Sequence, residues 1–377
     1  MPCHFNYVDT GEALEALVDR LQAFETVAVD TEADSLHHYY EKVCLIQLTV
    51  DRNTFIVDPL ADMEIRPLLD LLAVKKLLLH GAEYDLRMLR SSYRFKLQGE
   101  VFDTMLAAQL VEGEARSLVA LAKAYLGVEL TKQKQRSDWS RRPLSEDQLV
   151  YACNDTIHLA AIAAHLESEL KRSGRLEWHR ESCRRMVRAV AKEKPPVDPQ
   201  REWRIKGLSE LDRRQLAFVK ELWYWREHEA QQVDLPPFKV AGNQLLVDLA
   251  LWASHNRGHT SGGRPRLPRN CVGSRLAGLE DAISRARYMR EPEWPPLRVG
   301  NGMVAPEHGP ELDRLRAECA AIAEKLGVEA SLVASRRQLE AVSVARPTTA
   351  PALQKAGQFM DWQTELLLPV VKAVFGS

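Results

Sequence analysis

TVAVDTEADSLHHYYEKVCLIQLT, residues 26–49, holds two apolar runs on either side of a polar segment. The first run, Thr26 to Asp30, is short and rich in valine, which predicts a buried strand. Asp30 and Glu32 follow each other at a spacing of two, and residues i and i+2 of a strand share a face. Both carboxylates are therefore expected to point the same way from a packed sheet, where unpaired charges are costly.

A third carboxylate is expected at the start of a helix. The apolar run Lys76 to His80 predicts another strand, and the Gly81-Ala82 break that follows predicts a turn from strand to helix. Asp85 then lies in the first helical turn.

A later helix carries two further polar side chains. Ser145, with Gln148 three residues on, is a capping-box pattern and predicts that a helix begins here. Tyr151 and Asp155 are then i and i+4, so they lie on one helix face.

These carboxylates suggest a metal site when they are taken together. Each position alone has an ordinary explanation as a turn former or a helix cap. A cluster of like charges inside an α/β domain needs cations or partners to offset it, and oxygen ligands without an accompanying Cys or His set favour Mg²⁺ or Mn²⁺ over zinc. Two such divalent ions would balance the charge, and a two-metal site suits phosphodiester hydrolysis.

The same residues resemble a known family. Asp-Thr-Glu at 30–32, Asp85 and Tyr-x-x-x-Asp at 151–155 resemble the DEDD exonucleases of the tyrosine subclass, and Val150 stands where the sister subclass has its histidine. The longer stretches 29–49 and 137–145 are similar to bacterial ribonuclease D. The resemblance covers nearly the whole chain and implies an α/β ribonuclease-H-like exonuclease domain, a mixed sheet flanked by helices, followed by two small all-α HRDC-type domains.

The resemblance also implies roles for the matched residues. Asp30 would bridge two metals, Glu32 and Asp155 would complete the shell of the metal that carries the nucleophilic water, and Asp85 would hold the second metal through water. Tyr151 would orient the attacking water. The chain departs from many relatives at residues 81–83, where Gly-Ala-Glu stands near the position of a family Asn.

Strand candidates and proline-rich breaks define the expected organisation. An antiparallel meander followed by alternating strands and helices fits a mixed sheet. The breaks at 194–199 and 291–296 predict three domains. By the resemblance these are an exonuclease domain at 1–194, a first HRDC domain at 205–292 and a second, more divergent one at 310–377. The strand candidates are Thr26 to Asp30, Cys44 to Val50, Phe55 to Asp58, Lys76 to His80 and Glu100 to Phe102.

A cationic loop precedes the Tyr151 helix. The net charge of −1 conceals this local concentration of lysine and arginine between residues 132 and 142. A basic loop with an aromatic residue suits a single-stranded backbone and a stacked base. The residues expected to contact substrate are His80, Lys132, Gln135, Trp139 and Arg142.

The resemblance implies metal-dependent 3′–5′ exoribonuclease activity that trims the 3′ ends of tRNA precursors and other small structured RNAs and releases nucleoside 5′-monophosphates. Two alternatives stay open, a 3′–5′ DNA exonuclease and a non-catalytic nucleic-acid-binding scaffold on the same fold. The HRDC regions are expected either to grip RNA or to serve a mainly structural purpose. No apolar run approaches the length of a membrane span and no signal-peptide pattern begins the chain, so a cytoplasmic protein is expected. The oligomeric state is left open.

Overall fold

The computed structural model describes residues 4–114, 116–192, 198–255, 263–297 and 309–376. These residues form two compact units. The first unit comprises the described residues within 1–33, 43–192 and 303–377, and the second comprises those within 34–42 and 193–302. None of the described helices is both long enough and apolar enough to cross a membrane.

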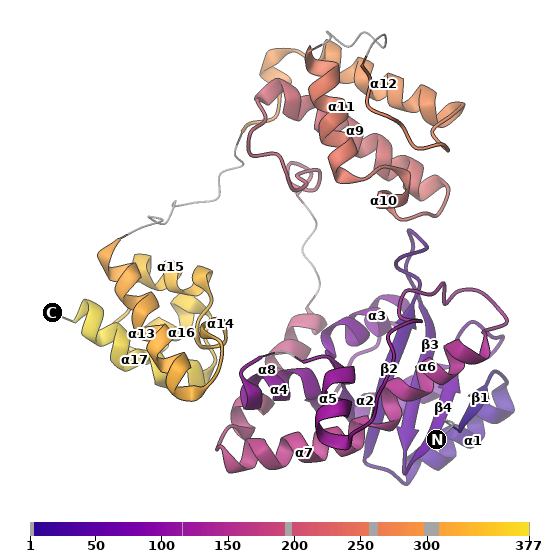
Figure 1. The fold of residues 1–377 in the computed structure, drawn as a ribbon, viewed down its shortest axis with the longest axis vertical. Helices are drawn as coiled ribbons and strands as arrows, with labels where there is room; N and C mark the ends of the chain where they lie inside the picture. Colours follow the sequence, from indigo (N-terminus) through magenta and orange to yellow (C-terminus); the bar gives the residue numbers. More distant parts are fainter. Residues whose placement is uncertain (1–3, 115, 193–197, 256–262, 298–308, 377) are drawn as a thin grey trace. The chain divides into compact units, whose positions relative to one another are not determined.

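A six-stranded mixed sheet forms the centre of the first unit (Figure 1). Its order is β1-β4-β3-β2-β5-β6, in which β2, β3 and β4 form an antiparallel meander and the other pairings are parallel. The five predicted strands are confirmed within three residues at each end, whereas β1 was not predicted. The strands are β1 Phe5–Val8, β2 Thr26–Ala33, β3 Val43–Val50, β4 Asn53–Val57, β5 Lys76–Leu79 and β6 Val101–Asp103.

Alternate residues of each strand pack into different cores. Val27 and Val29 of β2 join a core with four helices, α1 Gly11–Gln22, α2 Arg66–Val74, α3 Glu83–Tyr93 and α8 Leu176–Ala191. The residue between them, Ala28, packs instead with α4 Thr104–Glu112, α5 Leu118–Leu126 and α7 Leu159–Arg172. Helix α6, Glu146–Ile157, covers the same side of β2, β3 and β4 (Figure 1). Asp30 and Glu32 share the parity of Ala28, so their side chains leave the sheet on the α6 side.

The C-terminal helices have a core of their own and also contact the rest of the first unit. The rings of Trp178 and Trp362 stack with centroids 4.7 Å apart. Arg175 Nη2 donates to the carbonyl oxygen of Leu326 over 2.6 Å. These helices are α13 Pro310–Leu326, α14 Ala330–Val333, α15 Arg336–Ala345, α16 Ala350–Gly357 and α17 Asp361–Phe375.

The second unit is a helical bundle whose core includes three buried tryptophans, Trp203, Trp225 and Trp252. The all-helical character that the resemblance implies for this region is confirmed. The helices are α9 Arg213–Gln232, α10 Pro237–Val240, α11 Asn243–His255 and α12 Ser274–Tyr288, followed by the 3₁₀ turn Glu291–Glu293.

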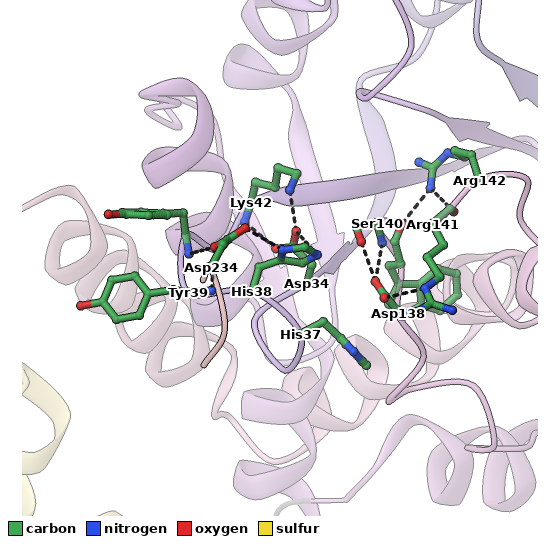
Figure 2. Close-up of polar contacts among 12 residues, drawn as sticks. Asp34, His37, His38, Tyr39, Lys42, Asp138, Ser140, Arg141, Arg142 and Asp234 are labelled. Atoms are coloured by element: carbon green, nitrogen blue, oxygen red, sulfur yellow. Dashed lines mark hydrogen bonds and ion pairs between the residues drawn. The ribbon is translucent and has the colours of Figure 1, made fainter. Parts of the chain in front are cut away.

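The loop between β2 and β3 belongs to this second unit. Asp234 Oδ1 accepts hydrogen bonds from the backbone N–H groups of Tyr39 and Tyr40 at 3.0 and 3.1 Å. Its other oxygen lies 2.8 Å from His38 Nδ1, and Lys42 pairs with the buried Asp34 at 2.7 Å (Figure 2). The loop that links two strands of the sheet is therefore held by a residue almost two hundred positions later in the chain.

Candidate active site

Three carboxylates meet between β2 and α6. Asp30, Glu32 and Asp155 can each offer one oxygen such that these atoms all lie within 4.8 Å of one another. The predicted capping box at Ser145 is confirmed, with Gln148 as its second member, so α6 begins where the sequence indicates. Tyr151 and Asp155 are one turn apart on one face of α6, and Asp155 lies in the cluster with Asp30 and Glu32.

Asp85 is a buried neighbour with a fixed orientation. It lies in the first turn of α3, as predicted. Its Oδ1 accepts from the backbone N–H of Thr31 at 3.1 Å and from Thr31 Oγ1 at 2.7 Å. Thr31 stands between the two β2 carboxylates, so the same strand that presents Asp30 and Glu32 also orients Asp85.

The turn at Gly81 and Ala82, which leads into the helix of Asp85, is stabilised by Asp103 at the end of β6. Asp103 accepts from the backbone N–H of Gly81 at 3.0 Å and of Ala82 at 2.8 Å. Gly81 has φ +77°, a left-handed conformation that glycine adopts without strain. Asp103 also caps α4 through Met105 N. The unusual residues at 81–83 therefore form a turn that an aspartate on another strand stabilises.

The electrostatics of this site favour a cation. Burial, followed by the charges of Asp85, Asp155 and Glu32, raises the pKa of Asp30 well above its ordinary value. Burial likewise raises the pKa of Glu32, and it raises the pKa values of Asp85 and Asp155 to about 7. Closely spaced carboxylates of this kind are hard oxygen donors for a divalent ion, and the residues present fit such a group.

Tyr151 is a hydrogen-bond donor in this environment. Burial raises the pKa of its phenol, and the charges of Asp155, Glu32 and Asp30 raise it further. Its hydroxyl group is hydrogen-bonded to Asp155. In the metal-free site the phenol therefore stays protonated at neutral pH and can orient a neighbouring oxygen without acting as a general base.

Two residues expected to contact substrate have other contacts. The Trp139 side chain is 1% exposed, and its ring lies 6.0 Å from that of Tyr151, so it supports the tyrosine and is not presented to stack on a base. Arg142 donates to both oxygens of Asp58 and to the carbonyl oxygens of Trp139 and Cys44. Its guanidinium thus anchors the loop on the end of β4, and neither residue presents the contact expected from sequence.

The other three expected contacts stay predictions. Lys132 and Gln135 are exposed on the loop. His80 Nδ1 lies 3.0 Å from Thr104 Oγ1, and its pKa is lowered mainly by burial, with Lys132 acting in the same direction. His80 and Lys132 are therefore close enough to interact, although they come from different parts of the chain.

Several supporting residues were missed from the sequence. Thr31, Asp103 and Asp58 act through hydrogen bonds that join distant segments. Asp103 had a signal, since an aspartate between an apolar run and a helix is a preferred N-cap. Thr31 and Asp58 had no comparable local signal.

Comparisons with known proteins agree with this geometry. A family model described as 3′-5′ exonuclease matches residues 5–171, and one described as HRDC domain matches residues 215–257. Ribonuclease D of Zymomonas mobilis is 30% identical over 354 residues, which are 92% of this chain and 89% of that protein. The chain belongs to the ribonuclease D family. It is a 3′–5′ exoribonuclease, with a ribonuclease-H-like α/β domain and an HRDC domain.

Solved structures show the same fold along the chain. RNase D of Escherichia coli, described as an exoribonuclease involved in structured RNA processing, is 24% identical and aligns with a TM-score of 0.71 over 99% of both chains. A protein from Bifidobacterium adolescentis, also 24% identical, gives a TM-score of 0.79 over 99% of this chain and 97% of its own.

Proposed function

We propose that this ribonuclease D family member trims the 3′ ends of tRNA precursors and other small structured RNAs, using two divalent ions, Mg²⁺ or Mn²⁺. The observation that carries the proposal is the cluster of Asp30, Glu32 and Asp155 with the buried Asp85 beside it. The strongest charge effects on Asp30 come from the other three carboxylates. A divalent cation bound here would offset that repulsion and would supply a Lewis acid for phosphodiester hydrolysis.

The side chains divide the work of this reaction. When bound, two divalent ions would lower the pKa of the attacking water and neutralise charge on the phosphoryl oxygens. Asp30, Glu32 and Asp155 would hold the first ion, and Asp30 would also be a ligand of the second. Asp85, held in place by Thr31, would hold the second ion through water. Tyr151 would orient the attacking water, and the product released would be a nucleoside 5′-monophosphate.

Substrate selection is proposed for the remaining parts of the chain. Lys132 and Gln135 are exposed on the loop before α6 and are suited to contact the RNA backbone. We place the exonuclease domain at 1–194, the first HRDC domain at 205–292 and a divergent HRDC-like domain at 310–377, and we assign the last two to gripping structured RNA. The description of the Escherichia coli relative as a structured-RNA enzyme supports this assignment. We further propose a cytoplasmic location.

A polarity and substrate assay tests the proposal. A 5′-labelled tRNA precursor with a 3′ extension is incubated with the full chain and Mg²⁺ or Mn²⁺, and a DNA strand with the sequence of the extension is run beside it. We expect stepwise 3′ shortening of the RNA, release of nucleoside 5′-monophosphates and no reaction in EDTA. Faster degradation of the DNA strand would contradict the RNA assignment and favour a DNA exonuclease.

A matched pair of variants makes the assay specific to the site. Asp155→Asn removes a carboxylate from the cluster, whereas Glu146→Gln makes the same chemical change at an exposed position of the same helix. The first variant is expected to lose hydrolysis and the second to retain it. Undiminished cleavage by Asp155→Asn would refute the proposed site.

A further inference from the structure

Gln47 on β3 has a buried amide group that lacks partners. Its side chain is 0% exposed, and within the described part of the chain neither Oε1 nor Nε2 has a hydrogen-bond partner. Most buried polar side-chain atoms in proteins are hydrogen-bonded, because burying an unpaired amide costs free energy. An amide kept at this position therefore calls for a ligand that completes its hydrogen bonds.

The register of the sheet places this amide beside the carboxylate cluster. Gln47 is the direct antiparallel partner of Asp30. Residues opposite each other in such a pair project from the same face with Cβ atoms about 4.5–5.5 Å apart. An Asp and a Gln side chain together can span that separation.

Thr49, the neighbouring polar residue on the same face, has hydrogen-bond partners, in contrast to Gln47. Thr49, two positions after Gln47, has its Oγ1 2.8 Å from Thr54 Oγ1 and 2.8 Å from Thr156 Oγ1. This contact attaches α6 to β3 and β4. The Gln47 amide, which lacks partners, thus lies opposite Asp30. Thr49, which joins α6 to the sheet, has its hydrogen bonds.

We propose that Gln47 is a positioning residue of the metal site: its Nε2, which has no partner in this structure, donates a hydrogen bond to the Asp30 carboxylate once the divalent ions are bound and so fixes the orientation of that carboxylate. Its Oε1 accepts from a water molecule in the same site. A neutral amide suits this position, because lysine would repel the cation and leucine has no donor. The inference rests on the proposed metal-dependent function and adds a residue to it.

Replacing the amide by an apolar chain of similar length tests the inference. In Gln47→Met the donor is lost and the unbranched thioether fills the space. We expect Mn²⁺ affinity, measured by calorimetry on the full chain, to fall about tenfold or more, the range found when partners of metal ligands are removed. The melting temperature in EDTA should be unchanged or higher, since an unpaired buried group has been removed.

Thr54→Val is the matched control. Thr54 is also 0% exposed and faces the same side one strand further along, and valine has nearly its shape. Loss of the hydrogen bond to Thr49 should lower the melting temperature by a few degrees. Mn²⁺ affinity should stay at the wild-type value.

The outcomes distinguish failure of the proposed role of Gln47 from failure of the metal site itself. Unchanged Mn²⁺ affinity in Gln47→Met, with a lower melting temperature, would show that the amide is structural and would overturn the inference alone. Failure of the wild-type chain to bind Mn²⁺ would overturn the metal site and with it this inference. If Gln47→Met does not fold, Gln47→Leu carries the same comparison, with the same expected loss of affinity.

Discussion

Two buried acidic sites of the first unit differ in what surrounds them. Asp58, 4% exposed, receives hydrogen bonds from Tyr7 and, through two nitrogens, from Arg142. Burial opposes its ionisation, but the hydrogen bonds from Arg142 and Tyr7 outweigh burial and hold its pKa below the ordinary value. In the cluster of Asp30 with its neighbours, burial and like charges act together and raise the pKa values.

The difference shows how a protein separates a structural carboxylate from a functional one. Asp58 has its cation within the chain, so it is ionised, satisfied and closed to ligands. The cluster has its strongest charge contacts with other acids, so it is most stable with protons or a metal bound. Removing a charge should therefore have opposite effects on folding at the two sites.

The largest expected effect is on catalysis. Asp30→Asn removes the proposed bridging ligand, and loss of several kcal/mol of transition-state stabilisation corresponds to a fall in kcat of roughly 10³-fold or more. RNA should still bind, because the exposed loop is unchanged. Single-turnover cleavage and a filter-binding assay measure the two properties. A variant that cleaves at the wild-type rate would contradict the role of Asp30.

The effect on folding comes next. Asp58→Asn leaves the Arg142 guanidinium without its charge partner and should lower the free energy of unfolding by about 3 kcal/mol. Asp30→Asn in EDTA should instead raise it, since a repelling charge is removed. Urea denaturation at pH 8 measures both.

A control for this pair is available on the surface. Asp70 pairs with Arg66 at 2.8 Å, and its side chain is 60% exposed. Asp70→Asn should change the free energy of unfolding by less than about 1 kcal/mol. Destabilisation by Asp30→Asn as large as that by Asp58→Asn would break the distinction between the two sites.

The metal-free protein should also respond to pH. Asp85 and Asp155 have pKa values of about 7 when folded and near the ordinary ~4 when unfolded. Between these values the folded state binds more protons, so stability falls as pH rises from about 4 to about 7 and then levels off. Thermal melts in EDTA should show this fall, and excess Mg²⁺ should reduce it at pH 7 to 8. Identical melting curves with and without Mg²⁺ at pH 8 would contradict the assignment.

A smaller catalytic effect is expected at Tyr151. Tyr151→Phe keeps the ring against Trp139 but removes the hydroxyl group, so kcat should fall about 10²-fold while Mn²⁺ affinity changes little. Because the phenol is not a base here, the remaining activity should keep the wild-type pH profile between pH 7 and 9. Loss of an ionisation in that range on mutation would show that Tyr151 does titrate.

Sequence predicted the residues of this site that lie on regular elements. Asp30 and Glu32 followed from the period of a strand, Tyr151 and Asp155 from that of a helix, and Asp85 from a glycine turn. These rules are local, and the structure places all five where the rules indicate.

The contacts of the loop before α6 could not be predicted from a local sequence pattern. Trp139 and Arg142 were expected to contact substrate, but the ring of Trp139 is buried and the guanidinium of Arg142 pairs with Asp58. The Arg142–Asp58 pair joins segments more than eighty positions apart, and the burial of Trp139 depends on packing under α6. Residue type alone reveals neither. The grouping of the Asp34–Lys42 loop with the second unit depends in the same way on Asp234, far along the chain.

Calorimetric titration of Mn²⁺ into the metal-free full chain, its Asp155→Asn variant and its Asp58→Asn variant tests the contrast between the two acidic sites most directly. We predict that the wild-type chain and Asp58→Asn bind Mn²⁺ and that Asp155→Asn binds it at least tenfold more weakly. Equal Mn²⁺ affinity in the wild-type chain and Asp155→Asn would contradict the account.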